Sequence, residues 1–156
     1  MKPKIVRNSE GTTYETSPIE RLTMKLSSAD TNNAVDYSEG SIGYLSGPPL
    51  HIHHTQDEIF HVLKGELRIQ IDKEAFDLGM GDVAFAPRGI PHTFTNLNQE
   101  PAHVIGIAIG GGFDHFYAEF VAAVAEKANP EQLAELSERH KIQIVGPPLA
   151  AMMQPG

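Results

Sequence analysis

Short segments that alternate apolar and polar residues, separated by glycine- and proline-rich turns, fill the chain from residue 11 to residue 109. In residues 66–72 (ELRIQID), for example, Leu67, Ile69 and Ile71 share one face and the polar side chains share the other. Alternation of this kind predicts half-buried strands, and many short strands with frequent turn signals predict an all-β sandwich or barrel. Further strands are expected at residues 20–26, 34–45, 58–64, 83–86, 92–96 and 102–109, with a turn-rich loop at 27–33.

The period changes after the three glycines at residues 110–112. The apolar side chains that follow recur at helical spacing and predict an amphipathic helix; they are Phe113, Phe116, Phe120, Val121 and Val124. Asn129, Pro130 and Gln132 have the capping pattern of a second helix, which runs to about His140. Residues 141–149 (KIQIVGPPL) return to extended chain.

These elements predict a single domain over residues 1–156. Its barrel core is expected at about residues 11–109, with two C-terminal helices, at about 113–140, packed on the barrel. No internal repeat or linker divides the chain.

Charge and cysteine content exclude several classes of function. The net charge is −8, and no run of lysine or arginine stands out, so we expect neither a nucleic acid nor a membrane as partner. Without cysteine, a disulfide scaffold, a cysteine-ligated zinc and a thiol nucleophile are excluded. The N-terminus lacks the apolar stretch of a signal peptide, and no run of about 18 apolar residues suggests a membrane span, which together predict a cytoplasmic protein.

Four of the eight histidines lie within residues 51–61. This clustering has four possible explanations: a metal site, a pH switch, a catalytic base or chance. His51 and His53 are two residues apart on a strand and project to the same face, whereas His54 points away. Glu58 begins the next strand and His92 begins a later one. Three imidazoles and a carboxylate that converge inside a barrel suit one divalent ion of iron, manganese, nickel, cobalt, copper or zinc. A His-x-His pair alone is more often an ordinary surface or core pair, so the joint pattern carries the prediction.

Residues 51–65 (HIHHTQDEIFHVLKG) and 81–96 (GDVAFAPRGIPHTFTN) resemble the two motifs of the cupin family in order and spacing. One departure is Gly47, which lies closer to His51 than the first motif usually places its leading glycine. Outside the motifs, the chain resembles the single-domain cupins described as quercetin-dioxygenase-like, so the resemblance covers nearly its whole length.

This resemblance implies a cupin-type jelly-roll β-barrel, a single metal held by His51, His53, Glu58 and His92, and a homodimer. It also suggests a dioxygenase that acts on a small, mostly apolar enol or aromatic compound, with Glu58 as catalytic base. Two alternatives stay open: an oxygen-independent metal-dependent isomerase, cyclase or lyase, and a non-catalytic small-molecule-binding cupin. Oxalate chemistry is disfavoured because no arginine stands just before His51 and because Arg68 is expected to face outward.

The other motif residues have structural explanations. Asn96 is expected to steady a strand end. His54 is expected to be exposed or to lie at a subunit contact, and His61 to be a histidine between strands with its hydrogen bonds satisfied. The pocket wall should include Phe60, Val62 and Phe94. Alternation does not decide which faces of residues 83–86 and 102–109 turn inward, because both faces of both segments are largely apolar. For the helix beginning at Phe113, docking to the sheet is preferred over covering the barrel mouth.

Overall fold

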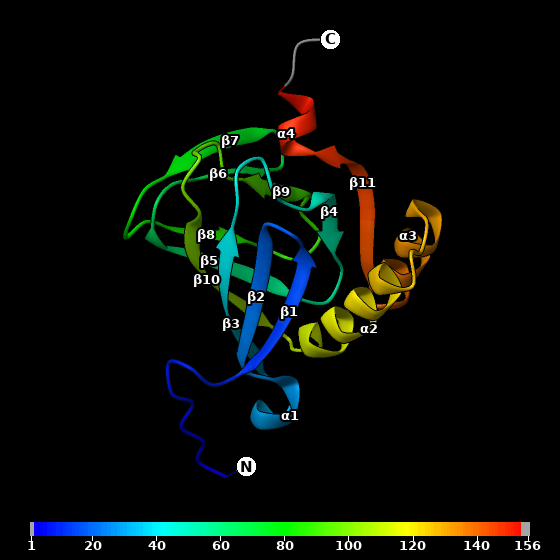
Figure 1. The fold of residues 1–156 in the computed structure, drawn as a ribbon. Coiled ribbons are helices and arrows are strands. Elements are labelled where there is room, and N and C mark those ends of the chain that lie inside the picture. The colour runs from blue at the N-terminus through cyan, green and yellow to red at the C-terminus, as the bar shows by residue number, and fades with distance from the viewer. Residues whose placement is uncertain (1, 154–156) are drawn as a thin grey trace.

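Two antiparallel sheets face each other in a computed structural model that describes residues 2–153 (Figure 1). The larger sheet has the strand order β1 (Thr12–Ser17), β2 (Glu20–Leu26), β3 (Val35–Ile42), β10 (Ala102–Ile109), β5 (Asp57–Lys64), β8 (Val83–Ala86). The smaller sheet has the order β11 (Ile142–Pro148), β4 (Pro49–His53), β9 (His92–Thr95), β6 (Leu67–Ile71), β7 (Glu74–Leu78). This is the all-β jelly-roll barrel that the sequence predicts.

The two expected C-terminal helices are confirmed as α2 (Phe113–Ala125) and α3 (Pro130–Arg139). The α3 capping box forms as expected: Gln132 N donates to Asn129 Oδ1 at 2.9 Å, and Asn129 N donates to Gln132 Oε1 at 2.9 Å. The helix α2 packs on β1 and α3 on β11, so both lie on one side of the barrel (Figure 1). Within residues 2–153, no helix is long and apolar enough to cross a lipid bilayer.

Some short elements were not expected from the sequence. Residues 27–33, expected to be a loop, contain a single helical turn, α1 (Ser28–Thr31), whose N-terminus is capped by Ser27 and Asp30. The strand β7 is short and contains acidic residues, which obscure the alternation of apolar and polar side chains. A further helical turn, α4 (Leu149–Met152), follows β11. None of these changes the barrel.

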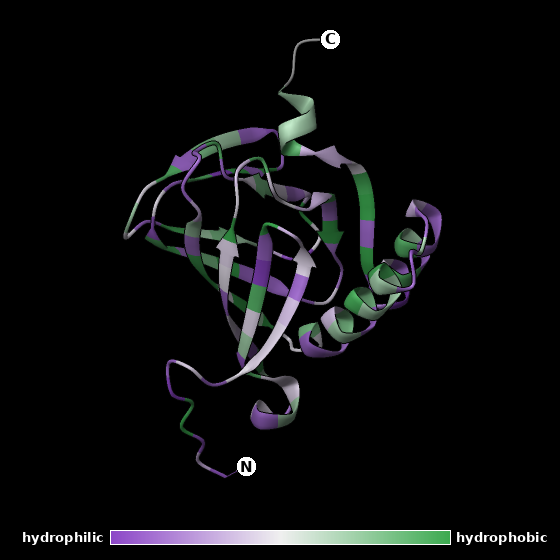
Figure 2. Ribbon diagram, viewed as in Figure 1, coloured by the Kyte–Doolittle hydropathy of each residue, from purple (hydrophilic) through white to green (hydrophobic). Residues whose placement is uncertain are grey.

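The barrel interior is built from the alternate residues of facing strands. Leu67 and Ile69 of β6 are fully buried, as the alternation in residues 66–72 predicts, and they pack against Phe60 and Val62 of β5. Figure 2 shows hydrophobic and hydrophilic residues interleaved along the strands and helices, as expected for elements with one buried face. The core therefore joins the two sheets and fixes the distance between them.

Replacing Ile69 with alanine should lower the free energy of unfolding by about 2–5 kcal/mol, because the cavity it leaves sits where both sheets meet. Urea denaturation followed by circular dichroism measures this change. The matched control is Ile5→Ala, at a side chain that is 76% exposed, which should change the free energy by less than about 0.5 kcal/mol. Equal effects of the two substitutions would contradict the assignment of Ile69 to the core.

Candidate metal centre

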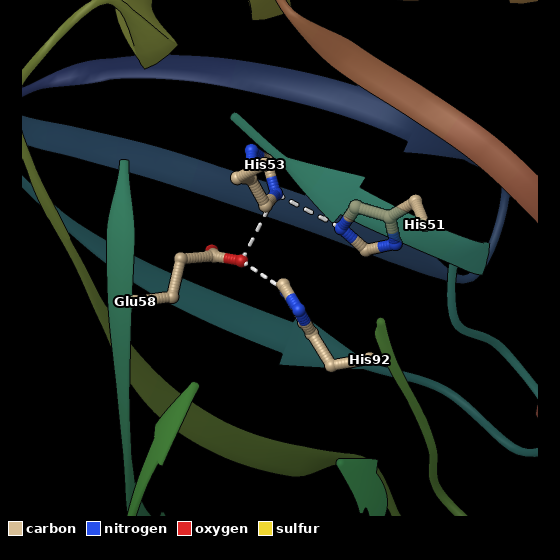
Figure 3. Close-up of side chains that lie close together, drawn as sticks. All are labelled: His51, His53, Glu58 and His92. Atoms are coloured by element: carbon tan, nitrogen blue, oxygen red, sulfur yellow. Dashed lines mark hydrogen bonds and ion pairs between the residues drawn. The ribbon is translucent and has the colours of Figure 1, made fainter. Parts of the chain in front are cut away.

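Four buried side chains from three strands meet inside the barrel (Figure 3). His51 and His53 extend from β4, and His92 lies directly opposite His51 at the start of β9. Glu58 comes from β5 in the other sheet, so the cluster bridges the two sheets. The side chains brought together are those that the sequence predicts as ligands.

The imidazole and carboxylate atoms of these residues face one another at short range. His51 Nε2 lies 2.9 Å from His53 Nε2, and Glu58 Oε2 lies 3.1 Å from His53 Nε2 and 2.7 Å from His92 Nε2. One ligand atom from each of the four residues lies within 4.8 Å of the others. His54 points away, as strand parity predicts, and its Nε2 lies 3.1 Å from Gln143 Oε1 near the surface.

Backbone carbonyls fix the orientation of two imidazoles. His51 Nδ1 lies 2.8 Å from the carbonyl oxygen of Pro49, and His92 Nδ1 lies 3.1 Å from that of Ile90. A carbonyl only accepts hydrogen bonds, so each Nδ1 must donate, and each neutral ring then turns a bare Nε2 lone pair toward the cluster. Such outer hydrogen bonds are typical of metal-binding histidines.

When all three imidazoles are neutral, as metal ligands must be, the cluster contains more acceptors than protons to share among them. The Nε2 lone pairs of His51 and His92 and the Glu58 carboxylate converge, and only the His53 ring is left to donate between them. Within residues 2–153, the buried His53 Nδ1 has no hydrogen-bond partner. Buried acceptors that face one another are costly unless a cation lies among them, so this donor set fits one divalent metal ion.

The titration behaviour of the cluster follows from its burial and its mutual contacts. Burial, together with the neighbouring His53 and His92, lowers the pKa of His51 to about 3, so this ring is neutral and able to bind a metal at neutral pH. Burial raises the pKa of Glu58, but its contacts with His53 and His92 outweigh that effect and hold the pKa below its ordinary value. Burial lowers the pKa of His92, but the hydrogen bond and the charge of Glu58 raise it more, so the pKa of His92 lies above its ordinary value.

Two glycines hold the ligand strands close together. Gly89 N donates to the carbonyl of His53 at 2.8 Å, which ties the turn before His92 to the end of β4. Gly47, at a φ of +154°, lies against β9, and a Cβ there would overlap the carbonyl oxygen of Phe94. The unusual position of Gly47 in the first motif therefore still serves the close approach of β4 to β9.

A cavity of about 60 Å³ opens beside Glu58. Its walls are mainly apolar and aromatic, with a few polar groups among them; the lining side chains include Leu22, Ile42, Phe60, Phe94, Val104, Phe113, Tyr117, Ser38, Glu20 and Arg21. Phe60 and Phe94 are confirmed as wall residues, whereas Val62 lies in the core behind them. The four-residue cluster thus adjoins a mostly apolar space through Glu58.

The structure settles which strand faces turn inward. Ala84 and Ala86 of β8 are buried, and so are Ala102, Val104 and Ala108 of β10. The small side chains Ala86 and Ala108 lie opposite Glu58 on the two neighbouring strands. The inward faces are therefore the small-residue sets, which leave room beside Glu58.

The start of α2 belongs to the cavity, whereas the rest of the helix docks. Phe113 is buried, with its ring centroid 5.0 Å from that of His53, so it covers the site at the barrel mouth. Phe116 packs instead on Phe120 of the same helix and on His140 after α3. The docking to the sheet expected for this helix is made on β1, where Tyr117 stacks on Tyr14. Asp36 accepts a hydrogen bond from Phe113 N at 2.8 Å and thereby anchors the helix start.

Seven cavity residues were missed from the sequence, among them Tyr117, Glu20 and Arg21. Tyr117 lies four residues after Phe113 and so shares its helix face, a spacing that could have indicated it. Glu20 occupies the same strand face as Leu22 and Met24, where a carboxylate is unexpected and therefore informative. Arg21 is exposed and gives no comparable signal.

The remaining sequence assignments concern structural residues. Asn96 is fully buried and its Nδ2 donates to the carbonyls of Ile42, at 2.9 Å, and Glu100, at 2.8 Å, which confirms its role in steadying the strand end. His61 lies on the face of β5 opposite Glu58. Arg68 faces outward and pairs with Asp77 at 2.5 Å, as expected.

Comparisons with known proteins agree with this arrangement. Residues 43–109 match the Cupin domain family. The quercetin 2,3-dioxygenase of Bacillus subtilis is 28% identical over 144 residues, which cover 85% of this chain and 42% of that enzyme. The uncharacterized protein MJ1618 of Methanocaldococcus jannaschii is 32% identical over 56 residues, 36% of this chain and 45% of that protein. The chain spans less than half the length of these relatives.

Solved structures share the barrel. KdgF from Halomonas sp. superposes with a TM-score of 0.65 at 18% identity, over 73% of this chain and 99% of that one. A predicted oxalate decarboxylase from Thermotoga maritima has a TM-score of 0.62 at 25% identity, over 68% and 98% of the two chains. The polyketide cyclase RemF from Streptomyces resistomycificus has a TM-score of 0.59 at 18% identity, over 69% and 80%. Because the family match spans both histidine motifs and the chain folds into the barrel of these structures, residues 43–109 form a cupin domain.

Proposed function

We propose that this cupin is a metal-dependent dioxygenase that acts on a small, mostly apolar enol or single-ring aromatic compound. The observation that carries the proposal is a buried cluster of three histidines and one glutamate, of which Glu58 lines an adjoining cavity with mainly apolar and aromatic walls. A divalent transition ion held by this cluster would supply open coordination positions for the paired oxygens of a substrate and for dioxygen. The partial similarity to a quercetin 2,3-dioxygenase supports the same chemistry.

The charges around the cavity favour a neutral substrate. Two carboxylates, Glu58 and Glu20, line the cavity, and they repel an anionic compound such as a dicarboxylate. Glu20 accepts hydrogen bonds from Ser46 Oγ at 2.5 Å and Thr16 Oγ1 at 3.1 Å, which hold its carboxylate in place. Arg21 lines the cavity but is exposed, where water screens its attraction for an acid. Oxalate is therefore a poor candidate.

The size of the cavity favours a substrate smaller than a flavonol. Its volume of about 60 Å³ is well below the roughly 300–1,000 Å³ of sites that enclose drug-sized ligands. A short diketone or a one-ring enediol matches this space better than a three-ring compound. Tyr117, Phe113 and Phe94 form part of the boundary that sets this limit.

The residues of the chain have separable roles in this proposal. The three histidines and Glu58 would hold the metal ion, and the aromatic side chains of the cavity wall would exclude water from the substrate. Glu58 is also placed to take a proton from a bound enol, although its lowered pKa makes it a weak base. Among residues 2–153, no hydrogen bond engages the hydroxyl of Tyr117, which leaves this group free to donate to a substrate oxygen.

An oxygen-uptake screen of metal-loaded protein tests the proposal. The panel should contain short diketones, one-ring enediols, catechols and flavonols, each tested with protein loaded separately with iron, manganese, nickel, cobalt, copper or zinc. We expect uptake with at least one of the small compounds and weaker uptake with the flavonols. Conversion of a compound without oxygen consumption would replace the proposal by the isomerase, cyclase or lyase alternative. Tight binding without any conversion would support the non-catalytic alternative.

A further inference from the structure

One position on the floor of the cavity beside Glu58 carries no side chain. Gly40 lies in the interior of β3 and lines this cavity. The inward-facing positions around it, two along β3 and one on each neighbouring strand, carry side chains that also line the cavity. They are Ser38, Ile42, Leu22 and Val104. We call the space among these four side chains the Gly40 recess.

The backbone does not require glycine at position 40. The φ of Gly40 lies outside the left-handed region, and the pairing of β3 with β2 and β10 is regular at this residue. The rest of the described chain also leaves room for a side chain. A Cβ on Gly40 would come no closer than 3.6 Å to a residue beyond its chain neighbours, at the carbonyl oxygen of Val104. Because glycine weakens the interior of a strand, this position lowers stability without a conformational reason.

Gly106, which also lines the cavity, has a packing reason that Gly40 lacks. A Cβ on Gly106 would lie 3.0 Å from Ser38 Oγ, closer than most such contacts. The Ser38 hydroxyl donates to the carbonyl of Gly106 at 3.1 Å. Contact with Ser38 therefore explains the glycine at 106, whereas no contact explains the one at 40. A glycine inside a strand often marks the place where a ligand approaches the backbone closely.

The recess lies away from the metal-binding cluster. Glu58 pairs with Ala108 of β10 from one side. Gly40 pairs with Val104 from the other side of β10, four residues before Ala108. In a flat sheet this offset separates the Cα atoms of Glu58 and Gly40 by roughly 16 Å, and the curvature of a barrel shortens it. A compound whose paired oxygens face the cluster therefore reaches the recess with its other end.

The walls of the recess favour a small apolar group. Leu22, Ile42 and Val104 are aliphatic, and the hydroxyl proton of Ser38 is already donated to Gly106. A polar group placed there would lose hydrogen bonds to water and find few partners in exchange. The space corresponds to one missing side chain, so a single small substituent fills it.

We propose that Gly40 determines which substrates the site accepts, because the recess takes up a small apolar substituent at the end of the substrate remote from the metal. This inference rests on the proposed function and narrows its substrate class. The favoured compounds are one-ring enediols or catechols that carry a small apolar group away from their paired oxygens. A short diketone leaves the recess empty, and a side chain at position 40 excludes the substituent.

Thermal unfolding, followed by circular dichroism, tests the premise without any ligand. Because a Cβ fits at position 40 and glycine weakens a strand, Gly40→Ala should raise the unfolding midpoint by about 1–4 °C. The glycine would then be unfavourable for the fold, as expected of a space that serves a ligand. An unchanged or lowered midpoint would show that the fold itself accounts for the glycine and would overturn the inference.

Calorimetric titration of zinc-loaded protein under nitrogen tests the role itself, since zinc has no redox chemistry that could consume the probe. The probes, catechol and 4-methylcatechol, share their paired oxygens and differ by one methyl group. Wild type should bind 4-methylcatechol about fourfold more tightly, the gain expected from burying one such group. Gly40→Ala places its own methyl group in the recess. The preference for 4-methylcatechol should therefore disappear or reverse, while the affinity for catechol changes little.

The matched control is Gly79→Ala, the same substitution in the turn between β7 and β8. A Cβ on Gly79 would lie 3.7 Å from Asp82 Oδ2, an ordinary contact, so the wild-type preference should persist. Equal binding of both probes by wild type, a preference that survives Gly40→Ala, or an equal loss in Gly79→Ala would overturn the role of Gly40 alone. Failure of both probes to bind wild type would overturn the proposed substrate class and the role of Gly40 with it. The expected change of preference, in a protein that consumes no oxygen with any compound of the screen, would overturn the oxygenase and support the role of Gly40.

Discussion

Replacing His51 or His92 with alanine should remove most of the metal from the protein, whereas wild type should hold about one divalent transition ion per chain. Loss of an outer hydrogen-bond partner of a metal ligand already costs about 10–100-fold in affinity, so loss of a direct ligand should cost at least as much. His51 and His92 both present a bare Nε2 to the cluster, because each Nδ1 is engaged by a backbone carbonyl. Elemental analysis of protein purified from metal-replete medium measures the content.

The matched control is His54→Ala, which removes an imidazole from the same strand end. His54 points away from the cluster and contacts Gln143 instead, so its loss should leave the metal content unchanged. Circular dichroism should confirm that each variant is folded. Loss of metal from His54→Ala with retention in His51→Ala would reverse the face of β4 that is assigned here to the site.

Strand parity is sufficient to bring His51 and His53 together, because residues two apart on a strand always share a face. It does not place His92 opposite His51 or Glu58 across the barrel, since those contacts depend on how distant strands pair. The resemblance to the cupin motifs supplied that part. The local sequence predicts the pair, and the family pattern predicts the cluster.

The alternation of residues could not predict which faces of β8 and β10 turn inward, and the reason is physical. Val83 and Phe85 are larger and more apolar than Ala84 and Ala86, yet the alanines are the buried pair. Hydrophobicity identifies an inward face only when the other face meets water. Here the space beside Glu58 requires the small residues inside.

Other elements depend on contacts that no local pattern encodes. The position of α2 over the cavity depends on the hydrogen bond from Phe113 N to the buried carboxylate of Asp36, which lies far away in the sequence. Burial raises the pKa of Asp36, and hydrogen bonds from Phe113 and Ser28 oppose that rise. The helix itself was predictable from its period, but its anchoring point was not. The spacing from Phe113 indicates Tyr117 only once this face of the helix is known to cover the cavity.

Replacing Glu58 with glutamine should lower turnover more than it lowers metal occupancy. Glutamine keeps the size and one oxygen donor but loses the charge and the basicity of the carboxylate. General-base assistance contributes about 10²–10⁴-fold, and the lowered pKa of Glu58 makes it a weak base, so we expect a loss near the lower end of this range. The measurement is oxygen uptake per bound metal ion, with one substrate from the screen, for wild type and Glu58→Gln.

The matched control is Glu20→Gln, which removes the other carboxylate from the same cavity while the cluster stays intact. If Glu58 acts as a base, its substitution should reduce the rate per metal about 100-fold, and that of Glu20 should change it far less. Similar losses in both variants would trace the effect to the charge of the cavity, because neither carboxylate would then be special. A rate per metal that is unchanged in Glu58→Gln would leave Glu58 as a ligand alone. A base that is also a ligand must be ionised before substrate arrives, and the low pKa that His53 and His92 impose on Glu58 meets that condition.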